Sequence, residues 1–275
     1  MNYTSSGGVG IQRYATEFYK KESIAGISQV IEDGDIVTAI TAIPSTHYND
    51  KEKCKSLINE NLVGTHVLEI DGESKTFTID EVKVTLQPLA SYFYTIVDEW
   101  GNMNQDMLAR YEGTETLVID IGWGTTDVAL VGNGGLSDFW TIQASMSSAY
   151  REIELTLKED KTFSTNTMQP LEIERQLRDN DVLTFSNRTV DASNAKKQVF
   201  KETAQQIMTE VNNHQNIEEM TTVIFTGGGF QALKEHLEPM ISNDQGQVLD
   251  NIFFIEDCQL ANAKGCYVFG KYISN

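Results

Sequence analysis

Two apolar runs, at residues 117–119 and 128–131, flank a polar segment whose residue types could bind a phosphate. The segment reads DIGWGTTD and spans residues 120–127. Glycines and threonines between two strands can turn backbone N–H groups and hydroxyls toward one point, which suits phosphate oxygens. An ordinary tight hairpin would have similar turn residues, so the composition alone leaves both readings open. The candidate phosphate-binding residues are Gly122, Gly124, Thr125 and Thr126.

Two carboxylates close this segment, Asp120 at its start and Asp127 at its end. Their charge would repel a bare phosphate, so they make chemical sense with a cation or water between. Mg²⁺ usually keeps several waters and bridges carboxylates to substrate phosphates. We therefore predict that Asp120 and Asp127 hold Mg²⁺ through water, and Asp120 is also a candidate catalytic residue.

A second cluster of glycines follows the apolar run at residues 223–226. Gly227, Gly228 and Gly229 form a predicted loop between this strand and the next helix. Glycines at a helix start let the backbone approach a flat or anionic ligand. The segment matches neither GxxxxGK[ST] nor GxGxxG, and a plain strand-to-helix turn is the alternative reading.

The elements that must position these residues alternate along the chain, which predicts an α/β fold. Helical spacing predicts helices over about 10–32, 50–62, 88–100, 145–158, 171–179, 193–213, 230–238 and 259–273. Short β-branched or alternating runs predict strands at 36–40, 66–70, 76–79, 82–86, 117–119, 128–131, 139–142, 223–226 and 252–255. Residues 66–70 and 76–79 flank a glycine-containing turn, the pattern of a hairpin.

Composition narrows the function classes. The chain has 275 residues, 40% of them hydrophobic, with a formal net charge of −19. Such an acidic chain lacks the clustered lysines and arginines that grip DNA phosphates, so we expect no direct DNA binding. Three cysteines without CxxC spacing favour reduced thiols in a cytosol. No apolar run reaches the length of a membrane span and no signal-peptide pattern is present, so we expect a cytoplasmic protein and no membrane partner.

The two loops, in this order and each attached to a strand, resemble the nucleotide clasp of the actin, heat-shock chaperone and sugar kinase superfamily. Three further stretches resemble the ParM-like actins that segregate plasmids. They are ITAIPSTHY at 40–48, KTFTIDEVKVTLQPLASYF at 75–93 and NAKGCYVFGKYI at 262–273. The resemblance runs from about residue 30 to the C-terminus, and the order of the motifs is more specific than any one of them.

The resemblance implies an actin-like ATPase fold built from ribonuclease H-like domains. Residues 1–100 would be the remainder of the N-terminal domain with its connecting helix, and 101–275 the C-terminal domain, with a small inserted lobe at about 150–192. Residues 120–127 would form the second phosphate loop and 227–229 the adenosine loop. Gln87 would position the attacking water. Lys201 and Glu202 would reach the ribose or base of ATP or ADP, with Mg²⁺; GTP is the alternative nucleotide.

One part of the family pattern is not found. The family begins with a strand, a first Asp-x-Gly phosphate loop and a lysine soon after, whereas no apolar strand leads into Gly7 and Gly8. We therefore expect an incomplete N-terminal domain, which leaves ATP hydrolysis open. The expected function is an actin-like ATPase whose filaments segregate plasmid DNA through a DNA-binding adaptor. A small-molecule kinase or phosphatase, or a non-catalytic interaction module, are the alternatives.

Overall fold

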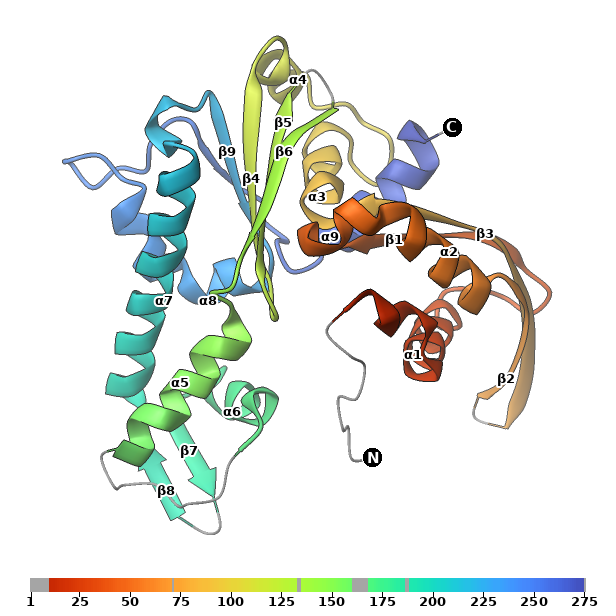
Figure 1. Cartoon of the computed structure of the whole chain (residues 1–275), viewed down its shortest axis with the longest axis horizontal. Helices are drawn as coiled ribbons and strands as arrows, with labels where there is room; N and C mark the ends of the chain where they lie inside the picture. The colour runs from red at the N-terminus through yellow and green to blue at the C-terminus, as the bar shows by residue number, and fades with distance from the viewer. Residues whose placement is uncertain (1–9, 71, 133–134, 160–167, 186–187, 275) are drawn as a thin grey trace.

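The computed structural model describes residues 10–70, 72–132, 135–159, 168–185 and 188–274. Figure 1 shows two sheet-containing lobes joined through a pair of helices, α3 and α9. The first lobe holds a three-stranded sheet in the order β1-β3-β2, and the second a five-stranded sheet in the order β10-β9-β4-β5-β6. None of the helices in the described ranges is long and apolar enough to cross a membrane.

The first lobe is built around one long strand. β3 (Glu73–Leu86) pairs antiparallel with β2 (Gly64–Ile70) through its first half and parallel with β1 (Ile36–Ile43) through its second half. The sequence predicts two strands here, at 76–79 and 82–86, and this is wrong. The register with β1 shifts at Asp80, whose carboxylate accepts a hydrogen bond from the Thr38 hydroxyl at 3.1 Å. A bulge thus lets one strand pass through the polar interruption without ending.

The remaining elements of this lobe cover the sheet. They are the 3₁₀ helices η1 (Ile11–Ala15) and η2 (Ser45–Asp50) and the helices α1 (Glu17–Ile27) and α2 (Lys51–Leu62). Cys54, Ile58 and Leu62 form the buried stripe of α2, at the i, i+4 spacing of one helix face. Tyr14 of η1 lies under this helix and shares a 2.8 Å hydrogen bond with the His47 ring.

The second lobe places its strands between helices. β4 (Glu115–Ile121) lies parallel to β9 (Thr222–Thr226), which lies parallel to β10 (Ile252–Phe254). β5 (Thr126–Gly132) and β6 (Gly135–Ile142) continue the sheet as an antiparallel hairpin pair. All five residues of β9 are buried, as expected of a strand covered on both faces. Figure 1 shows α3 and α9 on one side of this sheet and α7 and α8 on the other.

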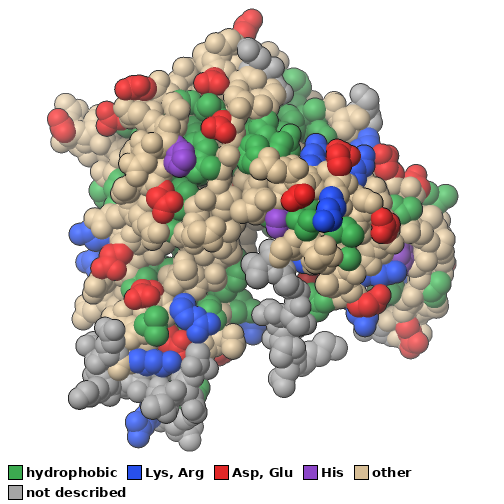
Figure 2. Space-filling model, in the orientation of Figure 1, with side chains coloured by type: hydrophobic (Ala, Val, Ile, Leu, Met, Phe, Trp, Pro, Cys, Tyr) green, Lys and Arg blue, Asp and Glu red, His purple; other side chains and the backbone are tan. Residues whose placement is uncertain are grey.

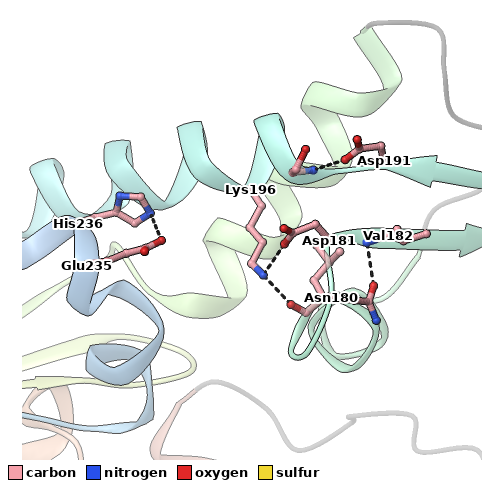
Figure 3. A network of polar contacts seen from close by, with 9 residues as sticks. Asn180, Asp181, Val182, Asp191, Lys196, Glu235 and His236 are labelled. Carbon is pink, nitrogen blue, oxygen red and sulfur yellow. Dashed lines mark hydrogen bonds and ion pairs between the residues drawn. The ribbon is translucent and has the colours of Figure 1, made fainter.

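Helices complete the second lobe. The sequence predicts the longer helices, but not α4 (Gln105–Tyr111), the 3₁₀ helices η3 (Ile217–Glu219) and η4 (Glu238–Met240), or the short strands β7 (Val182–Phe185) and β8 (Arg188–Asp191). The others are α5 (Met146–Glu159), α6 (Pro170–Leu177), α7 (Ser193–His214) and α8 (Gly228–Leu237). In Figure 3 the β7–β8 hairpin is tied to α7 through Lys196, whose ammonium lies 2.8 Å from Asp181 Oδ1.

Two helices join the lobes. α3 (Gln87–Ile96) follows β3 directly, and α9 (Ala261–Val268), continued by the π-helical turn η5 (Phe269–Ile273), packs against it. The sequence predicts that this helix continues to about residue 100, but α3 ends at Ile96. Asp98 Oδ1 accepts hydrogen bonds from the backbone N–H groups of Trp100 and Asn102, and these bonds form a turn. All three cysteines are free and buried. Figure 2 shows acidic side chains spread over both lobes, in keeping with the net charge of −19.

Candidate functional site

The two glycine segments meet at one edge of the five-stranded sheet. β4 and β9 are parallel neighbours, and Asp120 lies in register with Thr226 at the end of β9. The turn at residues 122–125 and the glycines at 227–229 therefore leave the sheet side by side. In Figure 1 the β4–β5 hairpin points toward α5 and away from α4. The carboxyl ends of parallel strands are where ligands bind in open α/β sheets, so this edge is the candidate site.

The turn between β4 and β5 is fixed by backbone hydrogen bonds. The Gly122 N–H donates to the Thr125 carbonyl at 2.9 Å, and the Gly122 and Trp123 carbonyls accept from the first N–H groups of α5. Trp123 is 43% exposed and tilts over the Tyr150 ring with 5.9 Å between ring centroids. Apart from its two chain neighbours, no described residue has an atom within 4 Å of a Cβ placed at Gly124. The tip of the turn is therefore open to a ligand.

The two threonines of the turn differ in their partners. The Thr125 hydroxyl donates to Asp127 Oδ2 at 2.9 Å. The Thr126 side chain is fully buried and its hydroxyl donates to the Ala144 carbonyl at 2.8 Å. Burial and this hydrogen bond turn the Thr126 hydroxyl toward the loop before α5, and a contact of Thr126 with phosphate stays a prediction.

Asp120 is a buried carboxylate with an open oxygen. It is 4% exposed, and its Oδ2 accepts a hydrogen bond from Asn262 Nδ2 at 2.7 Å. Burial raises the pKa of Asp120 from its ordinary value of 3.8 to about 6; the bond from Asn262 opposes this rise and the neighbouring charge of Asp127 adds to it. No described residue donates to Oδ1. A buried carboxylate with one unbonded oxygen has the chemistry of a cation ligand.

Asp127 lies opposite Asp120 across the two strands but has different surroundings. It is 2% exposed and accepts three hydrogen bonds: from the Thr141 and Thr125 hydroxyls at 2.7 and 2.9 Å, and from the Ser45 backbone N–H at 2.9 Å. Ser45 belongs to η2 of the other lobe. Both oxygens have protein donors, and the bond from Ser45 makes Asp127 a contact between the lobes; its water-mediated contact with Mg²⁺ stays a prediction.

Close packing explains two of the three glycines at 227–229. Gly227 has φ of +87°, and a Cβ there would collide with Asp120 Oδ1 and the Ile121 carbonyl. A Cβ at Gly229 would lie 2.6 Å from Ile121 Cγ2. Gly228 and Gly229 stand in the first turn of α8, so the predicted loop at 227–229 is only one residue long. Glycine here lets the α8 N-terminus approach Asp120, where its backbone N–H groups favour an anion.

The other predicted residues lie at different places. Gln87 is the first residue of α3 and is half-buried. Ser91, one turn later on the same face of α3, belongs to a polar network that reaches Asp120, so that face is turned toward the site. Lys201 and Glu202 are exposed on α7, and Glu202 accepts from Gln198 at 3.0 Å. Within the described ranges no hydrogen bond or ion pair links either residue to the two glycine segments.

Asn262 and Ser45 are site residues that the sequence patterns did not single out. Asn262 begins the NAKG string of α9 and lies 142 residues from Asp120 in the chain. Gly265, one helical turn later, was the available signal. A Cβ there would collide with the Ala90 carbonyl, so this glycine marks the face of α9 that contacts α3.

Comparisons with known proteins bear on the fold of the chain. The family described as "Archaeal actin homologue MreB-like, C-terminal" matches residues 118–239. No curated protein matches the sequence. The crystal structure of Ta0583, an archaeal actin homolog, is 16% identical with a TM-score of 0.74, over 94% of this chain and 77% of that one. The actin-like protein Alp7A is 14% identical with a TM-score of 0.73, over 93% and 74%.

Two further structures carry names that bear on assembly and ligands. A ParM in a 15-stranded filament from Clostridium botulinum is 16% identical with a TM-score of 0.73, over 94% of this chain and 74% of that one. The complex of Ta0583 with ADP is 16% identical with a TM-score of 0.72, over 94% and 78%. At such identities the likeness establishes the fold of the chain.

Proposed function

We propose that this chain, which has the actin-like ATPase fold, binds ATP or ADP with Mg²⁺ and assembles into nucleotide-dependent filaments. The observation that carries the proposal is the open oxygen of Asp120, placed between the turn at 122–125 and the N-terminus of α8. This arrangement offers one carboxylate for a cation and two groups of backbone N–H donors for phosphates. The filaments of the similar ParM protein support self-association of this chain.

Each residue of the site has a role in this proposal. The backbone N–H groups of Gly124 and Thr125 bind phosphate oxygens, Gly122 fixes the turn through its bond to the Thr125 carbonyl, and Asp120 holds Mg²⁺ through water. Mg²⁺ held at Asp120 would supply positive charge beside the phosphates. Gln87 orients a water through its amide, which suits a reaction that depends on positioning and electrostatics. Residues 227–229 present backbone to the nucleotide. We assign no role to Lys201 and Glu202 beyond the predicted contact with ribose or base.

We also propose a cellular role for these filaments. Filaments of this chain would segregate plasmid DNA in the cytoplasm, and the net charge of −19 favours a separate DNA-binding adaptor over direct contact with DNA. We propose a division of the chain at about residue 100 between the two domains, with residues 150–192 as the inserted lobe; this segment contains β7 and β8 and ends where α7 begins. GTP remains the competing nucleotide.

Isothermal titration tests the proposal. ATP, ADP and GTP are added to the chain with Mg²⁺ or with EDTA, and light scattering at each end point follows assembly. We expect binding that Mg²⁺ strengthens, and scattering that rises with ATP. Gly124→Val, at the open tip of the turn, should weaken binding, whereas Gly26→Val, on exposed α1, is the matched control. Failure of all three nucleotides to bind would refute the proposal.

A further inference from the structure

Four polar side chains next to the candidate site form a hydrogen-bonded network. The Thr226 and Ser91 hydroxyl oxygens are 3.3 Å apart, the Ser91 hydroxyl donates to Asn262 Oδ1 at 2.8 Å, and Asn262 Nδ2 donates to Asp120 Oδ2 at 2.7 Å. The network starts at Thr226, next to Gly227, and ends at the Asp120 carboxylate, where β4 leads into the turn. It therefore connects the two glycine segments through α3 and α9.

The hydrogen bonds of this network can all be arranged in one direction, from Thr226 to Asp120. Asp120 is an acceptor when ionised, so the Asn262 amide must present its NH₂ group to it and its oxygen to Ser91. The Ser91 hydroxyl proton then goes to that oxygen, and Thr226 donates to Ser91. Hydrogen bonds aligned in this way strengthen one another, and a bond to a charged acceptor is stronger than a neutral one. The orientation of Asn262 is thus fixed from both sides.

The contact between the helices makes this reach possible. Gly265 lies one turn from Asn262 on α9, and a Cβ at Gly265 would collide with the Ala90 carbonyl of α3. Ala90 precedes Ser91. The absence of a side chain at Gly265 therefore brings α9 close enough to α3 for Asn262 to contact Ser91 and Asp120 together.

We infer that Asn262 is a positioning residue that holds Asp120 by Oδ2, so that Oδ1 stays available to the site to hold Mg²⁺ through water. The inference rests on the proposed function. Ser91 acts one step further back, because its hydroxyl selects the orientation of the amide. A purely structural role for Asn262 would affect stability and leave the contribution of Mg²⁺ to nucleotide binding unchanged.

The test measures ADP affinity by isothermal titration with Mg²⁺ and with EDTA, and takes the ratio of the two dissociation constants. Asn262→Ala removes a hydrogen bond to a charged group, so we expect this ratio to fall about tenfold or more. Ser91→Ala leaves the amide free to turn and should give a smaller fall in the same direction. In an Asp120→Asn background, Asn262→Ala should change the ratio no further.

A matched control is available in the same lobe. Asn251 is half-buried like Asn262, and its Nδ2 donates to two backbone carbonyls, Ile217 and Met220, each at 2.8 Å. Asn251→Ala should lower the unfolding midpoint and leave the Mg²⁺ ratio at the wild-type value. An unchanged ratio in both Asn262→Ala and Ser91→Ala, with wild-type binding intact, overturns the positioning role alone. A wild type that binds no ADP overturns the proposed function, and the inference with it.

Discussion

Replacing Asp120 by Asn should stabilise the chain in the absence of nucleotide and Mg²⁺. Burial raises the pKa of this carboxyl from 3.8 to about 6, so the folded state resists its ionisation. Below pH 3.8 the carboxyl of Asp120 is protonated in both the folded and the unfolded state, so it costs the folded state no stability. Between 3.8 and about 6 the unfolded state ionises first, and the wild type loses stability as the pH rises.

Above about pH 6 the penalty is complete. A pKa difference of about 2 corresponds to about 3 kcal/mol, since each unit is worth about 1.4 kcal/mol. Asn has no such penalty and keeps an oxygen for the Asn262 amide. Asp120→Asn should therefore raise the free energy of unfolding by up to about 3 kcal/mol near neutral pH, and the gain should shrink toward pH 4.

Urea unfolding followed by circular dichroism, at several pH values from about 4.5 to 8, measures this difference. Asp98→Asn is the control with the opposite sign. Hydrogen bonds from the Asn102 side chain and from neighbouring backbone N–H groups lower the pKa of Asp98, so its replacement should cost stability near neutral pH. Saturating Mg²⁺ and ADP should reverse the order of wild type and Asp120→Asn, because the form that binds more tightly is stabilised more and only the wild type has the carboxylate for Mg²⁺.

Two results would refute this reasoning. The first is an Asp120→Asn variant that is no more stable than the wild type near pH 7.5. The second is a gain that stays constant down to about pH 4.5, because a pH-independent effect would come from packing and not from the buried charge.

Three further predictions concern neighbouring positions. Asp127→Asn should lower the free energy of unfolding by about 2 kcal/mol, because its three donors lose a charged acceptor. If Asp127 holds Mg²⁺ through water, this variant should also lower the Mg²⁺ ratio for ADP, and an unchanged ratio would overturn that prediction. Gly265→Ala should force α9 away from the Ala90 carbonyl and lower the free energy of unfolding in urea by about 1–3 kcal/mol. Gly26→Ala is the control and should not lower it, because no described residue lies near the added Cβ. In a variant with Trp123 as the single tryptophan, ADP should change the fluorescence, since Trp123 lies in the open turn; no change would place the nucleotide elsewhere.

Local patterns were sufficient to predict the α/β class and most elements, and the predicted actin-like fold is confirmed. Two apolar runs, around Val118 and before Thr226, correctly predict β4 and β9. They are recognisable because a strand buried on both faces is apolar along its length. The strands β7 and β8 have four residues each and α4 has seven. Elements this short show no periodic pattern, and none of the three is an unbroken apolar run like β10, so the sequence did not reveal them.

The candidate site was predictable only in part. The glycines at 122, 124 and 227–229 mark the right edge of the sheet, but at Gly227 and Gly229 the need for glycine comes from packing against Asp120 and Ile121. Spacing in the sequence cannot separate a glycine that admits a ligand from one that admits a neighbouring chain segment. Asn262 escaped prediction because its partner is 142 residues away, a distance that no local pattern spans.

The difference between Asp120 and Asp127 follows from what surrounds two otherwise equivalent positions. They face each other across β4 and β5, where like charges repel. Asp127 receives donors from its own hairpin, from Thr141 on β6 and from Ser45 of the other lobe, so its charge is satisfied by protein. Asp120 receives one donor, and its pKa rises. A cation beside Oδ1 would remove both the repulsion and the cost of burial. The energy that destabilises the free chain at Asp120 is therefore available to bind Mg²⁺ there.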